Sequence, residues 1–132
     1  MLSGIGSAFA AEAKVKTFIY KYNLAAGADS VQISLPARIP VSLAGNCLTP
    51  GFRGVAQATL QSLPTGFVEW TGLETTSPSS ITEGYSKSSG THILYLDYNH
   101  EVDVQVVSST QIKVHNGSTE ARRGQITLTY SE

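Results

Sequence analysis

From Lys16 onward, with an interruption over 75–90, apolar and polar residues alternate with a period of two, and this alternation restricts the possible folds more than any other feature. A period of two is typical of strands that have one face in a core and the other in solvent. The connections between the alternating segments are too short for crossover helices, so parallel βαβ units are excluded and antiparallel pairing is predicted. The alternating segments are 17–22, 31–35, 39–43, 54–60, 67–70, 93–98, 101–107, 112–114 and 126–130.

These segments predict an all-β domain: an antiparallel two-sheet β-sandwich of about nine strands, of jelly-roll or immunoglobulin-like type. Two packed sheets are a stable way to bury strands that are apolar on one face only. The 132 residues fit a single domain with one core. We expect that domain over 16–132, after an N-terminal arm over 1–15 that is flexible or forms a short helical turn with Leu2, Ile5 and Phe9 on one side.

Turn-forming residues separate the predicted strands. The segment 63–66 reads Leu-Pro-Thr-Gly, and Asn116 precedes Gly117 in a dipeptide whose two residues tolerate positive φ. Asn99 and His100 mark the tip of another hairpin. The stretch 75–90 is dominated by Ser, Thr, Gly and Pro without a sustained period, so it is predicted to be the longest loop, where binding residues often occur.

The charge balance argues against a strongly charged partner. The chain has 9 basic and 10 acidic residues and a net charge of −1, so no positive field is available to gather nucleic acid. Arg122 and Arg123 form a basic pair beside Gly124, and this pair is predicted to lie in a solvated turn. The sequence has no run of about 18 apolar residues, so we predict a soluble domain without a membrane span.

Cys47 is the only cysteine, so neither an intramolecular disulfide nor a cysteine-only metal site can form. It lies in 45–51, whose Gly, Asn and Pro residues predict a turn. A lone thiol is expected to pack as a small hydrophobe. The lack of disulfides favours a reducing, cytoplasmic compartment over an oxidising one.

The three histidines lie in the C-terminal half of the chain together with several acids: His92, Asp97, His100, Glu101, Asp103 and His115. Imidazole and carboxylate groups can bind a divalent metal. The spacing does not support such a site, because metal-binding jelly rolls of the cupin kind have a His-x-His pair followed by glutamate, and this chain has no such pair. We therefore predict neither a metal nor a cofactor, and we expect the strand acids, Asp97 and Asp103 among them, to face outward.

Aromatic side chains are the remaining chemical signal, because flat rings stack on pyranose faces and tyrosine adds a polar tip. The core is the alternative location for Trp70, which shares a strand face with Val68. No catalytic residue is predicted, because the chain has neither a Gly-x-Ser-x-Gly elbow nor a glycine-rich phosphate loop. The candidate ligand-binding residues are Trp70, Tyr85, Tyr98, Arg53 and His100.

The sequence favours a non-enzymatic binding or assembly module that forms homo-oligomers. The grounds are a β fold with exposed edges, a near-neutral charge and an apolar arm that can pack on a neighbour. The first alternative is a carbohydrate-binding domain that binds a glycan through Tyr85, Tyr98 and Trp70. The second alternative is a metal-dependent enzyme built on a β-sandwich.

Overall fold

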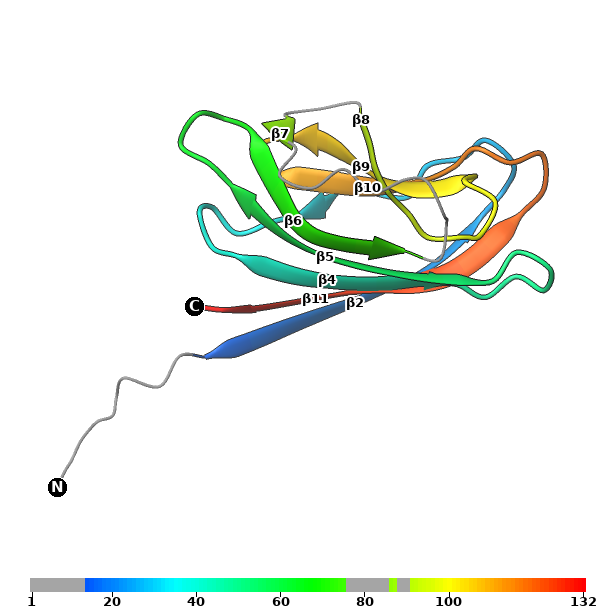
Figure 1. Cartoon of the computed structure of the whole chain (residues 1–132), viewed down its shortest axis with the longest axis horizontal. Coiled ribbons are helices and arrows are strands. Elements are labelled where there is room, and N and C mark those ends of the chain that lie inside the picture. The colour runs from blue at the N-terminus through cyan, green and yellow to red at the C-terminus, as the bar shows by residue number, and fades with distance from the viewer. Residues whose placement is uncertain (1–13, 76–85, 88–90) are drawn as a thin grey trace, which may run out of the picture.

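The computed structural model describes residues 14–75, 86–87 and 91–132, and all regular secondary structure in these residues is β-strand. Two antiparallel sheets lie face to face (Figure 1). The larger sheet has six strands in the order β2 (Val15–Leu24), β11 (Arg122–Ser131), β4 (Val41–Cys47), β5 (Gly54–Ser62), β6 (Val68–Thr75) and β7 (Ser86–Lys87). The smaller sheet has four strands in the order β3 (Ile33–Ser34), β10 (Gln111–Asn116), β9 (Val102–Ser108) and β8 (Thr91–Tyr95).

The predicted all-β, antiparallel, two-sheet sandwich is confirmed. Each predicted strand segment contains a strand, although 31–35 is reduced to the two residues of β3. The short strand β7 lies inside the stretch predicted as the longest loop, and 76–85 and 88–90 of that stretch lie outside the described residues. The turn over 63–66 is confirmed, because Gly66 has a φ of 91° and its N–H donates to the carbonyl of Leu63 at 3.0 Å.

The first and last described strands are neighbours. β2 pairs with β11 from Val15 opposite Ser131 to Leu24 opposite Arg122, and β11 pairs on its other side with β4. The larger sheet therefore brings the two ends of the described chain side by side.

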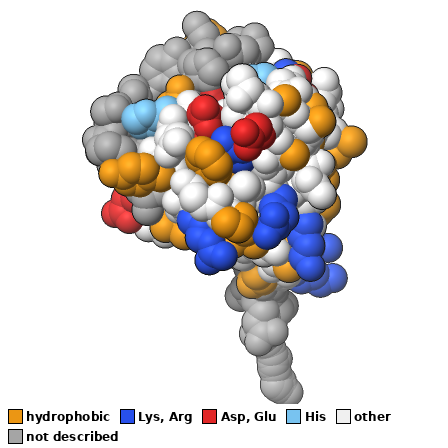
Figure 2. Space-filling model, turned by 90° about the vertical axis from the view of Figure 1, so that its right-hand side faces the viewer, with side chains coloured by type: hydrophobic (Ala, Val, Ile, Leu, Met, Phe, Trp, Pro, Cys, Tyr) orange, Lys and Arg blue, Asp and Glu red, His pale blue; other side chains and the backbone are white. Residues whose placement is uncertain are grey.

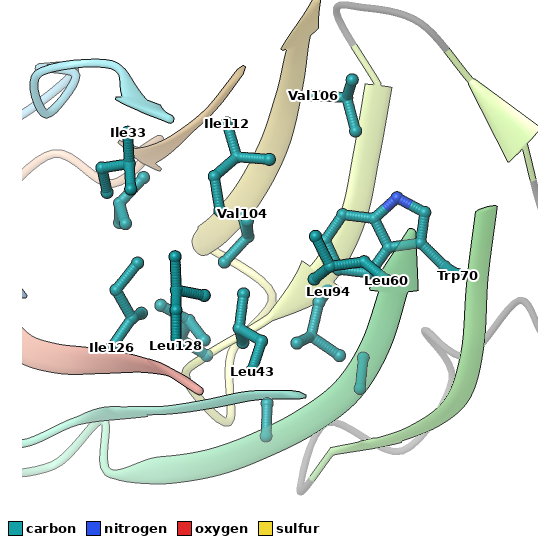
Figure 3. Close-up of a cluster of buried hydrophobic side chains, with 14 of the residues drawn as sticks. Ile33, Leu43, Leu60, Trp70, Leu94, Val104, Val106, Ile112, Ile126 and Leu128 are labelled. Carbon is teal, nitrogen blue, oxygen red and sulfur yellow. The ribbon is translucent and has the colours of Figure 1, made fainter. Parts of the chain in front are cut away.

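The core lies between the two sheets and is built from the inward-facing residues of each strand. In β5 every second residue from Gly54 to Ser62 is buried, as the alternation predicts. Leu43, Ile126 and Leu128 of the larger sheet point toward Val104 and Ile112 of the smaller sheet (Figure 3). Burial of each such aliphatic side chain contributes about 1.5–3 kcal/mol, so this interdigitation is the main stabilising term.

Two turn predictions are wrong for residues at strand ends, because the strands extend further than the alternation suggested. The turn predicted over 45–51 begins only after β4, where the Phe52 N–H donates to the Thr49 carbonyl at 3.0 Å. Cys47 is the last residue of β4, and its thiol is buried as expected. Arg122 and Arg123 open β11, and only 3% of the surface of Arg122 is exposed. Neither residue belongs to a solvated turn, because both pair with β2 opposite Leu24 and Asn23.

Tyr22 connects three strands of the larger sheet. It lies opposite Gly124 of β11, and its hydroxyl donates to the main-chain carbonyl of Asn46 in β4 at 2.7 Å. A Cβ atom on Gly124 would collide with that carbonyl and would lie 2.5 Å from Tyr22 Oη. Gly124 is therefore required because the phenol crosses directly over its backbone.

We predict that Gly124→Ala lowers the free energy of unfolding by about 1–3 kcal/mol, since Tyr22 must move and its hydrogen bond must lengthen or break. Chemical denaturation checks this value. Thr129→Ala, on the outward face of the same strand, controls for alanine in a strand and is expected to cost less than about 1 kcal/mol. Equal costs for the two variants would contradict this role of Gly124.

Candidate functional site

The structure separates the five residues that were predicted to bind a ligand. Trp70 is 0% exposed and points into the core beside Leu60 and Leu94 (Figure 3). The core was the alternative location predicted for it, so Trp70 cannot line a surface site. Tyr85 lies outside the described residues. Arg53 and Tyr98 are exposed and His100 is half-buried, and these three residues lie on loops.

Those loops lie at one end of the sandwich, where β4 joins β5, β8 joins β9 and β10 joins β11. Figure 2 looks onto this end of the molecule, where acidic side chains gather above, basic side chains gather below and hydrophobic ones lie between them. We call the segments 48–53, 96–101 and 117–121 the loop end. It is the part of the described structure that holds most of the predicted ligand-binding residues.

Arg122 fastens the three segments of the loop end together. Its guanidinium lies 3.6 Å from the centre of the Phe52 ring, in cation–π geometry. Its Nη2 donates to Glu101 Oε1 at 3.1 Å, and its Nη1 donates to the Ala121 carbonyl at 3.1 Å. Because each partner comes from a different segment, one buried cation fixes how the three segments lie relative to one another.

A buried carboxylate shapes the turn between β8 and β9. Asp97 is 0% exposed, and its Oδ1 accepts the main-chain N–H groups of Glu101 and Val102 at 2.9 Å each. His100 has a φ of 62°, and its ring centroid lies 4.8 Å from that of Tyr95. The hairpin tip predicted here is confirmed, and His100 is held against Tyr95 rather than projecting freely.

The prediction that Asp97 and Asp103 face outward into solvent is wrong for both residues. Asp103 is only 1% exposed, and Gln105 Nε2 donates to its Oδ1 at 3.3 Å. Alternation gives the side of a strand on which a residue lies, but it does not show whether neighbouring side chains cover that side. Burial, together with the negative charges of Asp103 and Asp97, raises the pKa of the Tyr95 phenol.

The Tyr22 phenol is also held protonated. Burial is the largest cause that raises its pKa, followed by Cys47 and Asp97 nearby. Both phenols are therefore protonated near neutral pH.

Two residues of β10, Lys113 and His115, form a charged cluster with Asp29 that the sequence did not predict. Lys113 Nζ lies 2.8 Å from Asp29 Oδ2, and His115 Nδ1 lies 2.5 Å from Asp29 Oδ1. Asp29 precedes Lys113 by 84 residues in the chain, so no local sequence pattern links it to its partners. Hydrogen bonds from Lys113 and then from His115 lower the pKa of Asp29.

The described residues contain no group of three His, Cys, Asp or Glu side chains placed to hold a metal. His115 is paired with Asp29, and His100 is packed on Tyr95. The side chain of His92 lies outside the described part of the chain.

The outer edge of β2 is the most exposed apolar feature of the described residues. The five residues from Val15 to Ile19 are exposed on both faces of the strand, with Val15 at 66%, Phe18 at 45% and Ile19 at 55%. β2 pairs with β11 on one side, and no described strand pairs with its other side. In Figure 1, β2 and the end of β11 form the lower border of the molecule.

Comparison with protein-family models, with curated proteins and with solved structures gave no match. The described residues also contain no helix with the length and apolar character needed to cross a membrane.

We predict that Glu101→Gln destabilises the domain more than Arg122→Met does. The first change leaves a buried guanidinium without its nearest carboxylate, which costs about 2 kcal/mol, whereas the second leaves a carboxylate that is 36% exposed and can be hydrated. Urea unfolding measures both values. Glu120→Gln is the control, because that carboxylate is 74% exposed and 3.9 Å from Arg122, and it is expected to cost less than about 0.5 kcal/mol. Equal costs for Glu101→Gln and Glu120→Gln would contradict the role of the Arg122–Glu101 pair at the loop end.

A second prediction concerns Asp29. Its lowered pKa means that its ion pairs stabilise the fold above the unfolded pKa of about 3.9, and that this contribution is lost as pH falls through the lower, folded pKa. Asp29→Asn is therefore expected to lower stability by up to about 1 kcal/mol at neutral pH, since the pairs are partly exposed. Urea unfolding from neutral to strongly acidic pH checks whether the two proteins converge. A difference that stays constant over the whole pH range would rule out this role.

Proposed function

We propose that this protein is a non-enzymatic assembly module that self-associates through the outer edge of β2. The observation that carries the proposal is a ten-residue edge strand whose first half exposes large apolar side chains on both faces. An edge strand presents a row of main-chain N–H and C=O groups that can pair with another strand. Pairing with a second copy would satisfy these groups and cover the apolar side chains at the same time.

The lysines of β2 set a condition on this pairing. Lysine on an edge strand is a common protection against association, because two like charges repel when they face each other. Lys16 lies on the inward face of β2 and Lys21 on its outward face, since β2 alternates. An acceptable register must therefore keep each lysine away from its own copy.

A two-fold axis through Phe18 meets this condition. In that antiparallel register Phe18 faces its own copy, Thr17 faces Ile19, and Lys16 faces Tyr20. The two larger sheets then continue as one sheet, with both cores on the same side. The contact is isologous, so it closes after two copies and does not propagate into a fibre.

We expect Ile19→Lys to raise the dissociation constant of the dimer at least about tenfold. The change places a charge in both Thr17–Ile19 cross-strand pairs and removes an exposed apolar side chain without touching the core. Sedimentation velocity over a concentration series measures the constant. Val31→Lys is the matched control, because Val31 is also exposed, at 66%, but lies outside β2, and it should leave the constant unchanged.

Either of two results would contradict the proposal. One is a wild-type chain that sediments as a monomer at every concentration, and the other is an Ile19→Lys variant that associates as strongly as the wild type.

A further inference from the structure

The outward face of the larger sheet carries a depression of about 600 Å³ over the middle of β4 and β5. Val41, Leu43, Gly45 and Cys47 of β4 face the core, so Ala44 and Asn46 face outward. Ala44 lies opposite Gln57 on one side and opposite Thr127 on the other. A methyl group surrounded by longer side chains makes a hollow, and this explains why the depression is centred here.

The walls come from two adjacent rows of cross-strand neighbours. One row runs Thr127, Ala44, Gln57, Glu74, and the next runs Gln125, Asn46, Val55. All of them line the depression. Four strands thus contribute to it, and the amide, carboxylate and hydroxyl groups of its lining stand beside a larger apolar area.

Hydrogen bonds between the lining groups hold the amides in place. Gln57 Nε2 donates to Glu74 Oε1 at 2.7 Å, and the main-chain N–H of Gln125 donates to Asn46 Oδ1 at 2.9 Å. Gln125 Nε2 donates to Thr127 Oγ1 at 3.3 Å. Side chains that are already fixed lose little entropy when they bind a ligand.

These bonds also decide which groups face a ligand. Because Asn46 Oδ1 and Glu74 Oε1 accept bonds from within the sheet, the Nδ2 group of Asn46 and the second oxygen of Glu74 are directed to other partners. The Oε1 atoms of Gln57 and Gln125 are acceptors, and each Nε2 keeps a second N–H beyond the one that it donates within the sheet. The hollow therefore offers several amide donors and several acceptors close together.

We propose that this depression is a binding site for a neutral saccharide. A sugar hydroxyl both donates and accepts, so it matches a mixed set of amide and carboxylate groups. The apolar C–H face of a pyranose can pack on the methyl groups of Ala44 and Val55, of which Val55 is 60% exposed. The volume lies within the range of about 300–1,000 Å³ typical of small-ligand sites.

Other ligand classes fit the lining less well. Among the described lining residues there is one carboxylate, from Glu74, and no Lys or Arg, so these residues would repel an anion. One carboxylate is too few for a divalent cation, which takes about six oxygen ligands and usually several carboxylates. A lipid or an apolar ligand would leave the amide groups without hydrogen-bond partners.

The site differs from the one that the aromatic residues suggested. Its described lining has no aromatic ring, so ring stacking contributes nothing and we expect a dissociation constant of about 0.1–1 mM. It is also independent of self-association, because β11 separates β2 from β4 and pairing at the β2 edge leaves the depression open. Failure of one proposal therefore does not imply failure of the other.

The test is a titration of the ¹⁵N-labelled full chain with neutral sugars: glucose, galactose, mannose, N-acetylglucosamine and their disaccharides. We expect at least one sugar to shift the side-chain amide signals of Asn46, Gln57 and Gln125. Glucuronic acid and sulfated galactose serve as charged comparisons and should bind at least about fivefold more weakly, because Glu74 repels them. If no neutral sugar shifts these signals, or if only the charged sugars do, the proposal is wrong.

Ala44→Leu fills the floor of the depression and removes no polar group. It should weaken binding at least about tenfold, since the sugar ring loses its place above the methyl group. Thr71→Leu is the matched control, because Thr71 is exposed on β6 and does not line the depression, and it should bind as the wild type does. Glu74→Ala, a second variant, releases Gln57 and should also weaken binding. Undiminished binding by a folded Ala44→Leu protein would overturn the assignment.

Discussion

The pairing of β11 with both β2 and β4 is the interaction on which the larger sheet depends. β11 lies between the first described strand and the rest of the sheet, so it fixes where the outer edge of β2 is presented. Its outward residues Gln125 and Thr127 also form one wall of the depression. The two proposed surfaces therefore rest on one strand. The Tyr22 phenol, which crosses Gly124 to reach β4, holds that strand in register with both of its neighbours.

Charged side chains hold the segments of the loop end in place. Arg122 is buried against Phe52 and paired with Glu101, and Asp97 caps the turn that carries Glu101. A buried ion is retained only where its partners are well placed, because the desolvation cost is otherwise too high. These contacts fix the three segments of the loop end relative to one another. The proposed self-association and ligand binding use other surfaces, the β2 edge and the outward face of the larger sheet.

The sequence predicted the strands well because alternation reports directly on which face of a strand is buried. It did not predict the burial of Asp103 or Arg122, since a period of two does not show which side chains cover a face. The Asp29–His115 pair was invisible for a different reason: its members meet only through the fold. The depression over Ala44 likewise requires the register of four strands, which no single segment contains. The aromatic signal led instead to Trp70, which is a core residue.

Amide hydrogen exchange of β2 at low and high protein concentration tests the central claim most directly. If β2 is the interface, the main-chain amides on its outer edge exchange with solvent in the dilute monomer and become protected as copies pair. The slowing should be confined to β2, because β11 already protects the amides on the other side of that strand. Exchange rates in β2 that do not depend on concentration, or protection that grows at β8 instead, would contradict the account.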